Sequence, residues 1–349
     1  NTFDFQDDEA WVSQWAKGNF ERFPDDNRLH PDSKLEAWAS FIALVEFINT
    51  AIQLPGIKLK PSYYSHDDVT KIDVDLVLDI GNSRTCGLLV EIPQSDGQSN
   101  LQMETVSQLS LRDLGQPNLE YTGLFESRVE FSDLSFGYDH YSRMSGRNNA
   151  FLWPSFVRFG PEAVRLMSND TGNEAFSGLS SPKRYLWDNS LFEQRWRFHN
   201  SQSENRLPRS LRAMLPDLTA RGEHRQQIEN ETKAKLRRHD REQLQEATTA
   251  EFSKSSLYGF MLIEIIAQAF RQINDPKYRG NKNNKTISRA LRNVIITLPT
   301  ATPKQEQAIV KSKVTGALDL LWTRMANSGQ VIKDTRPEIN INWDEASCS

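Results

Sequence analysis

The sequence predicts a mixed α/β fold, and three apolar patterns carry this prediction. Residues 73–80 alternate between aliphatic and mostly acidic side chains, which is the period of a half-buried strand. Residues 293–298 (Asn-Val-Ile-Ile-Thr-Leu) form a short apolar run that ends at a proline, as buried strands often do. Residues 253–273 are apolar around most of their helical circumference, which predicts a buried helix.

The first strand leads into a predicted hairpin. Gly81-Asn82-Ser83 is a turn signal, and the apolar, β-prone run 85–92 follows it. Residues 101–109 are consistent with a third strand. Further predicted elements follow along the chain: a strand at 155–159, a helix at 161–167 with Pro161 in its first turn, a helix that Thr302-Pro303 opens, and a strand at 338–343.

Two segments stand apart from this pattern. Residues 1–72 are predicted to be helical followed by a linker, with an amphipathic helix near 33–51 and a shorter helix that carries Trp11 and Trp15. Residues 191–290 resemble a helical insertion that includes a charged arm at 221–246. We therefore expect an N-terminal segment, 1–72, and a domain of residues 73–349.

Composition narrows the class of protein. The chain has 349 residues, 42 Lys plus Arg against 46 Asp plus Glu, and 38% hydrophobic residues. This balance excludes collagen, a coiled-coil rod and wholesale disorder. A net charge of −4 excludes a nucleic-acid binder that depends on bulk positive charge.

Location and metal content are constrained by what the sequence lacks. No apolar run approaches the roughly 18 residues that a membrane-spanning helix needs, and the acidic start does not resemble a secretory signal. Two cysteines form neither a disulfide framework nor a zinc site. We expect a cytoplasmic protein, although secretion as an effector stays open.

The end of the first strand carries the residues with the most chemical meaning. Asp79 precedes the turn, and its carboxylate could hold a hydrated Mg²⁺. Gly81 permits close approach of a ligand, and the amides that follow can point at an anion. An ordinary hairpin turn explains the same residues equally well, because turns favour Asp, Gly and Asn.

Residues 79–87 (Asp-Ile-Gly-Asn-Ser-Arg-Thr-Cys-Gly) resemble the first phosphate motif of the actin, DnaK-type chaperone and sugar kinase superfamily. In that superfamily, two lobes with ribonuclease H-like cores clamp ATP and Mg²⁺ between two β-hairpins. Further segments resemble the chaperone in the same order: 154–159, 183–186, 294–307 and 344–346. The sequence is closer still to the bacterial virulence factor SrfB family, to which 76–91, 182–188 and 343–349 are similar.

The resemblance implies a role for each matching residue. Asp79 corresponds to the aspartate that holds Mg²⁺ through water, and the turn with its two following residues, Arg84 and Thr85, to the phosphate cradle. Lys183 corresponds to the lysine near the γ-phosphate, although an exposed surface lysine is the alternative. Glu345 corresponds to a glutamate at the Mg²⁺ shell, although it also suits the first turn of a helix.

The resemblance implies an ATPase whose first lobe lies in residues 73–349, with ATP and Mg²⁺ as cofactors. The second phosphate motif and the adenosine motif are expected after the helix that links the lobes, so these residues carry half of a nucleotide cleft. The alternative is a non-catalytic scaffold that binds proteins of a virulence-associated complex. A pantothenate-type kinase fits less well, because its phosphate motif begins the chain. The aromatic residues Phe192, Trp196 and Phe198 suit core packing better than base stacking.

Overall fold

The computed structural model describes residues 71–92, 106–132, 153–169, 176–199, 207–232, 245–280, 282, 285, 287–327 and 335–344. All of them belong to one compact unit made of residues 62–139 and 149–349. The helices predicted within residues 1–70 lie outside the described residues.

A six-stranded sheet forms the centre of the described fold. Its order is β11-β10-β1-β2-β3, and β6 also pairs with β2. The strands are β1 (Ile72–Ile80), β2 (Arg84–Glu91), β3 (Val106–Gln108), β6 (Phe125–Glu126), β10 (Arg289–Leu298) and β11 (Glu338–Asp344). The β2 strand pairs antiparallel with both β1 and β3, whereas β10 runs parallel to β1 and β11 parallel to β10. The predicted hairpin, buried strand and last strand are confirmed.

The alternation seen in the sequence becomes the two faces of β1. Val74, Leu76, Leu78 and Ile80 are at most 1% exposed on one face, whereas Asp79 on the other is exposed. In β10, all residues from 294 to 298 are buried on both faces. That pattern is typical of a central strand in a parallel arrangement.

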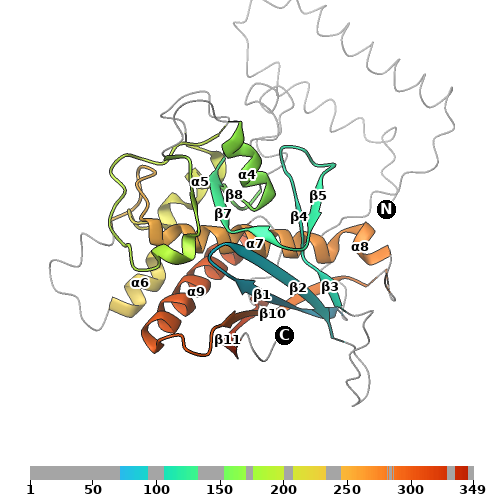
Figure 1. The fold of residues 1–349 in the computed structure, drawn as a ribbon. Helices are drawn as coiled ribbons and strands as arrows, with labels where there is room; N and C mark the ends of the chain where they lie inside the picture. The colour runs from blue at the N-terminus through green and yellow to red at the C-terminus, as the bar shows by residue number, and fades with distance from the viewer. Residues whose placement is uncertain are drawn as a thin grey trace, which may run out of the picture. The chain divides into compact units, whose positions relative to one another are not determined.

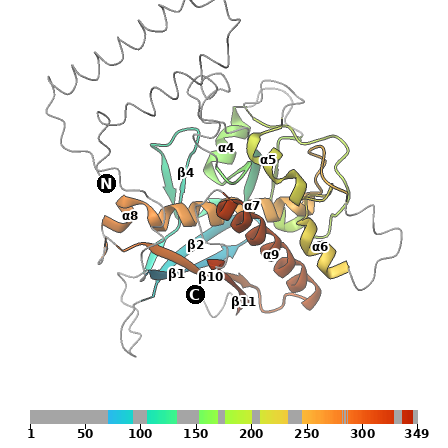
Figure 2. The same ribbon diagram turned by 180° about the vertical axis from the view of Figure 1, so that it is seen from behind.

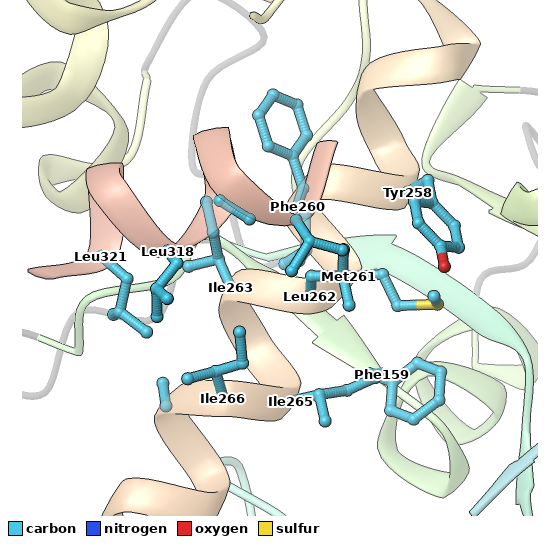
Figure 3. Packing of buried hydrophobic residues seen from close by; sticks show 14 of the residues in the cluster. Phe159, Tyr258, Phe260, Met261, Leu262, Ile263, Ile265, Ile266, Leu318 and Leu321 are labelled. Atoms are coloured by element: carbon cyan, nitrogen blue, oxygen red, sulfur yellow. The ribbon is translucent and has the colours of Figure 1, made fainter. Parts of the chain in front are cut away.

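Two long helices cover the sheet. The α7 helix (Lys254–Asn274) begins at Ser253, whose hydroxyl accepts a hydrogen bond from the Ser256 amide, as an N-cap does. The α9 helix (Lys304–Asn327) starts just after the predicted position and packs along α7. Figure 3 shows Ile263 of α7 beside Leu318 of α9, both within one buried cluster.

The α7 helix lies between the sheet and a second group of small elements (Figures 1 and 2). This group holds the hairpin of β4 (Ser110–Arg112) and β5 (Glu120–Thr122) and the sheet β8-β7-β9, made of Val157–Phe159, Arg128–Phe131 and Gly178–Ser180, with α4 (Pro161–Ser168) beside it. The sequence predicts β8 and α4, which are confirmed. It does not predict β4–β7 or β9, because strands of two to four residues are too short to show a period.

The remaining elements lie in the region predicted as an insertion or beside it. They are η3 (Pro182–Tyr185), α5 (Arg209–Met214), η4 (Leu215–Asp217), α6 (Arg225–Thr232) and α8 (Pro276–Gly280). The α6 helix begins the predicted charged arm, and its Gln227 donates to Ser312 on α9. Residues 233–244 of the arm lie outside the described residues. Because α7 belongs to the central core, the boundaries of any insertion stay a prediction.

Aromatic side chains fill the space between α7 and the β8-β7-β9 sheet. Phe131 contacts the rings of Phe156, Trp196 and Phe260. The Trp196 indole N–H donates to the Phe252 carbonyl, so its polar atom is satisfied. The predicted core packing of Phe192, Trp196 and Phe198 is confirmed, because Trp196 belongs to the buried core and the other two rings pack against it. In the part of the chain that the structure describes, no helix is both long and apolar enough to cross a membrane.

A buried ion pair connects β8 with α7 inside this core. Arg158 on β8 donates to Glu264 on α7 at 3.2 Å, and the side chains are 0% and 2% exposed. Glu264 also accepts hydrogen bonds from the Trp153 indole and from Gln268. Removing one partner of such a pair leaves an uncompensated charge in a dry interior.

We therefore predict that Arg158→Met lowers the free energy of unfolding by about 3–5 kcal/mol, measured by urea denaturation. The double variant Arg158→Met/Glu264→Gln should recover about half of that loss, because it removes both charges of the pair while Trp153 keeps an acceptor. Lys277→Met, at an exposed ion pair with Glu120, is the control and should change stability by less than about 0.5 kcal/mol. A cost for Arg158→Met as small as the control's would contradict this account.

Glu162, in the first turn of α4, is a buried acid whose pKa is raised. Its carboxylate accepts from the amides of Leu114 and Gly115, both at 3.0 Å. Burial raises the pKa of Glu162 from 4.5 to about 7; the charge of Arg158 and the Leu114 amide oppose this shift, whereas Asp113 adds to it. Between these pH values the folded chain holds a proton that the unfolded chain has released.

We predict that the protein becomes less stable as the pH rises from about 4.5 through 7, because the stabilisation that comes from binding this proton in the folded state is lost. Glu162→Gln cannot titrate, so the stability of the wild type relative to the variant should fall by roughly 1–3 kcal/mol over that window. Urea denaturation of both proteins at a series of pH values measures the difference. Parallel stability curves would show that Glu162 titrates alike in the folded and unfolded states.

Candidate functional site

The turn between β1 and β2 is closed by its own backbone. The Gly81 amide donates to the Arg84 carbonyl at 2.9 Å. A Cβ on Gly81 would lie 2.7 Å from that carbonyl oxygen, so any other residue would push the turn open. Glycine is thus required here by the close approach of two backbone segments.

Two amides of this turn are available for a ligand. Asn82 and Ser83 are exposed, and in the described part of the chain their backbone N–H groups donate to no other atom. Consecutive free amides in a tight turn form a concave donor surface that suits an anion. The turn therefore has the composition of a phosphate cradle and also the free donors that such a cradle needs.

Lys183 lies at this turn. Its ammonium group donates to the carbonyl of Ile80, the last residue of β1, at 2.8 Å, although the two residues are 103 positions apart. The side chain is half-buried and forms no ion pair among the described residues. Its two remaining N–H bonds are free to contact a ligand at the hairpin.

The segment that carries Lys183 is held at both ends. Before it, Ser181 has a φ of 55°, a left-handed conformation that non-glycine residues seldom adopt. The Ser181 amide donates to the Ser127 carbonyl at 2.6 Å. After it, the hydroxyl of Ser255 at the start of α7 donates to the Leu186 carbonyl at 2.8 Å. These contacts fix the short helix η3 against the core.

Ser127 has no counterpart in the predictions from the sequence. It lies between β6 and β7, and its hydroxyl donates to the Gly81 carbonyl at 2.9 Å and shares a 2.8 Å hydrogen bond with the Thr85 hydroxyl. Its amide donates to the Ser83 carbonyl at 3.0 Å. An isolated serine gives no sequence signal, because its role is created by the segments that converge on it.

Other predicted residues of the motif have defined partners. Arg84 forms an exposed ion pair with Glu126 at 2.5 Å, and Thr85 is buried against Ser127. Asp79 is exposed, stands opposite Cys86 in the hairpin and has no cationic partner among the described residues. Burial, and then the charge of Asp79, raise the pKa of the Cys86 thiol, so this cysteine stays protonated near neutral pH.

The strand register places this turn at the carboxyl ends of the parallel strands. Asp79 pairs with Thr297 of β10, and Thr297 pairs with Trp343 of β11. The carboxyl ends of the three parallel strands thus lie together. Glu345 follows β11 in sequence but lies outside the described residues. Within the described ranges, no three His, Cys, Asp or Glu side chains are grouped to hold a metal ion directly.

A separate small cavity lies among α6, α7 and α9. Gly222, His224, Gln227 and Lys313 are among the residues that line it, and its volume is about 30 Å³. That is room for about two water molecules. Burial lowers the pKa of His224 at its wall. The cavity is too small for a nucleotide and does not touch the hairpin turn.

A family model described as virulence factor SrfB matches residues 1–349. No curated protein matches the chain with significance. The similarity to SrfB inferred from residues 76–91, 182–188 and 343–349 is confirmed by this match. Because the match extends over its whole length, the chain belongs to the SrfB family.

Proposed function

We propose that the described unit is the first lobe of an actin-like ATPase, and that the turn after β1 binds the phosphates of ATP with Mg²⁺. One contact carries the proposal: the Lys183 ammonium lies 2.8 Å from the Ile80 carbonyl. The turn and Lys183 are the two segments that resemble the chaperone's phosphate motif and catalytic lysine. Their meeting at one point supports a shared site.

The order of the sheet supports the same proposal. Three antiparallel strands are followed by two parallel ones, with α9 as the connection between β10 and β11. This order is expected of a ribonuclease H-like core. In open α/β sheets, ligands bind beyond the carboxyl ends of the strands, which is where the turn lies.

The residues present fit a triphosphate with Mg²⁺. The amides of Asn82 and Ser83 would donate to phosphate oxygens, and Lys183 would supply a positive point charge. Asp79 has a free carboxylate and would hold Mg²⁺ through water. Asn82 lacks the hydroxyl that the chaperone motif carries at this position, whereas donation by the backbone amide is kept.

The bound Mg²⁺ would neutralise charge on the phosphates, and the chain's own groups would orient them. Catalysis of phosphoryl transfer is largely positioning and electrostatics, which requires both sides of a cleft. By resemblance, Glu345 would contact the Mg²⁺ shell and couple the lobes. We therefore expect residues 73–349 alone to bind ATP weakly and to hydrolyse it negligibly.

A second function, a non-catalytic scaffold, is favoured by a different observation. Trp187 is 58% exposed, and tryptophan is enriched among the residues that contribute most to binding between proteins. In this function the SrfB chain would bind members of a virulence-associated complex without using ATP. Partner binding that is unchanged by Mg²⁺-ATP and by Lys183→Ala would favour the scaffold.

We predict that Lys183→Ala weakens Mg²⁺-ATP binding by about tenfold or more, because a charge-assisted contact is worth about 1.5–3 kcal/mol. Lys311→Ala, at an exposed lysine on α9, is the matched control and should bind as the wild type does. Isothermal titration at low salt measures both affinities. Equal affinity in the wild type and Lys183→Ala would remove the lysine from the site.

The role of Asp79 gives a metal-dependent prediction. Asp79→Asn should weaken ATP binding several-fold in Mg²⁺ and leave it unchanged or slightly tighter in EDTA, because the carboxylate acts through the metal and otherwise repels phosphate. Asp73→Asn, at the other end of β1, is the control. A loss of affinity for Asp79→Asn that is the same with and without Mg²⁺ would contradict a metal-holding role.

Gly81→Ala tests the turn itself. The added Cβ would collide with the Arg84 carbonyl, so the turn must open and the two amides must reorient. We predict that ATP binding falls below detection, whereas the midpoint of urea unfolding shifts only modestly because the turn is exposed at the surface. A variant that binds ATP normally would show that the turn geometry is not needed.

A further inference from the structure

We propose that Ser127 is a positioning residue of the phosphate site, which sets the turn and the Lys183 segment at a fixed separation. This inference rests on the proposed function and extends it to a residue outside the motifs that resemble the superfamily. Ser127 is 4% exposed and therefore does not touch a ligand itself.

The contacts of Ser127 with the turn involve both its side chain and its backbone. The hydroxyl donates to the Gly81 carbonyl, and the amide donates to the Ser83 carbonyl. These two carbonyls belong to the peptide units whose N–H groups are those of Asn82 and Arg84. Because a peptide unit is planar, fixing the carbonyl also fixes the direction of its amide. Ser127 thereby aims the Asn82 amide outward.

The contact of Ser127 with the lysine segment uses its remaining backbone group. Its carbonyl accepts from the Ser181 amide at 2.6 Å, two residues before Lys183. Ser181 is held in a left-handed conformation, which persists only where surrounding contacts impose it. The hydrogen bond to Ser127 is one such contact.

One residue thus connects both halves of the candidate site. The neighbouring ion pair of Glu126 with Arg84 and the pairing of β6 with β2 keep this connection in register. The chain also offers a matched comparison. Ser127 and Ser132 flank β7 on either side, and the Ser132 hydroxyl is buried without a hydrogen-bond partner among the described residues.

The experiment compares the wild type with Ser127→Ala, Ser127→Thr and Ser132→Ala. The ligand probe is inorganic tripolyphosphate with Mg²⁺, which needs no adenosine site, and its dissociation constant is measured by isothermal titration. Hydrogen exchange of the peptide that contains Gly81 supplies a readout that needs no ligand, because the Gly81 amide is protected by its bond to Arg84.

Ser127→Ala should weaken tripolyphosphate binding about fivefold to tenfold, as expected for one lost hydrogen bond that orients a donor. Exchange at Gly81 should become faster in the same variant. Ser127→Thr keeps the hydroxyl and should restore both values to within about twofold of the wild type. Ser132→Ala should leave both unchanged, since it removes a hydroxyl that bonds to none of the described residues.

Two outcomes would overturn the inference. One is binding by Ser127→Ala that equals that of the wild type; the other is a loss that Ser127→Thr does not restore, which would indicate a general packing defect. Failure of the proposed function looks different: the wild type would bind neither tripolyphosphate nor ATP. Faster exchange in Ser127→Ala would then show that Ser127 orders a turn with another purpose.

Discussion

The parallel pairing of β1 with β10 is the constraint on which the rest of the fold depends. Leu78 and Thr297 lie side by side although they are 219 residues apart in sequence. Closing a loop of that length has an entropic cost, which the burial of β10 on both faces must offset. A parallel pair also needs a crossover connection, and the chain between the two strands supplies one that includes α7. The second group of elements packs on the far side of α7 and extends the same core.

This pairing explains which parts of the fold could be predicted. The hairpin, β10, α7 and α9 are long enough for the spacing of their apolar residues to be recognised in the sequence, and all are confirmed. The short strand β7 does not show this period, because Glu130 is fully buried within it. Besides its neighbour Arg128, Glu130 pairs with His199, and in β8 the buried Arg158 pairs with Glu264. No local pattern indicates His199 or Glu264 as a partner, because both are distant in sequence. The turn of the candidate site was predictable from residue type, whereas Ser127 acts through contacts that exist only after folding.

The two ends of the strands in the central sheet differ in whether their charged and polar groups are paired. At the amino end of β10, Arg289 is fully buried, donates to Glu91 at 3.2 Å and exchanges hydrogen bonds with Asn274. These contacts connect β2, α7 and β10. The buried Arg289 is thus paired with Glu91, and these contacts hold the strands in register.

At the carboxyl ends of the parallel strands, charged and polar groups are exposed to solvent. Asp79, Asn82 and Ser83 are exposed, and Lys183 is held there by a carbonyl rather than by a carboxylate. A carbonyl orients the ammonium without neutralising it, so the positive charge remains available, whereas a carboxylate partner would compete with an incoming anion. In the proposed function, an ammonium group fixed next to free amides would be preorganised for a phosphate. The two ends of the strands would therefore be complementary in the proposed function: the paired end would supply the rigidity that the exposed end needs in order to bind phosphate.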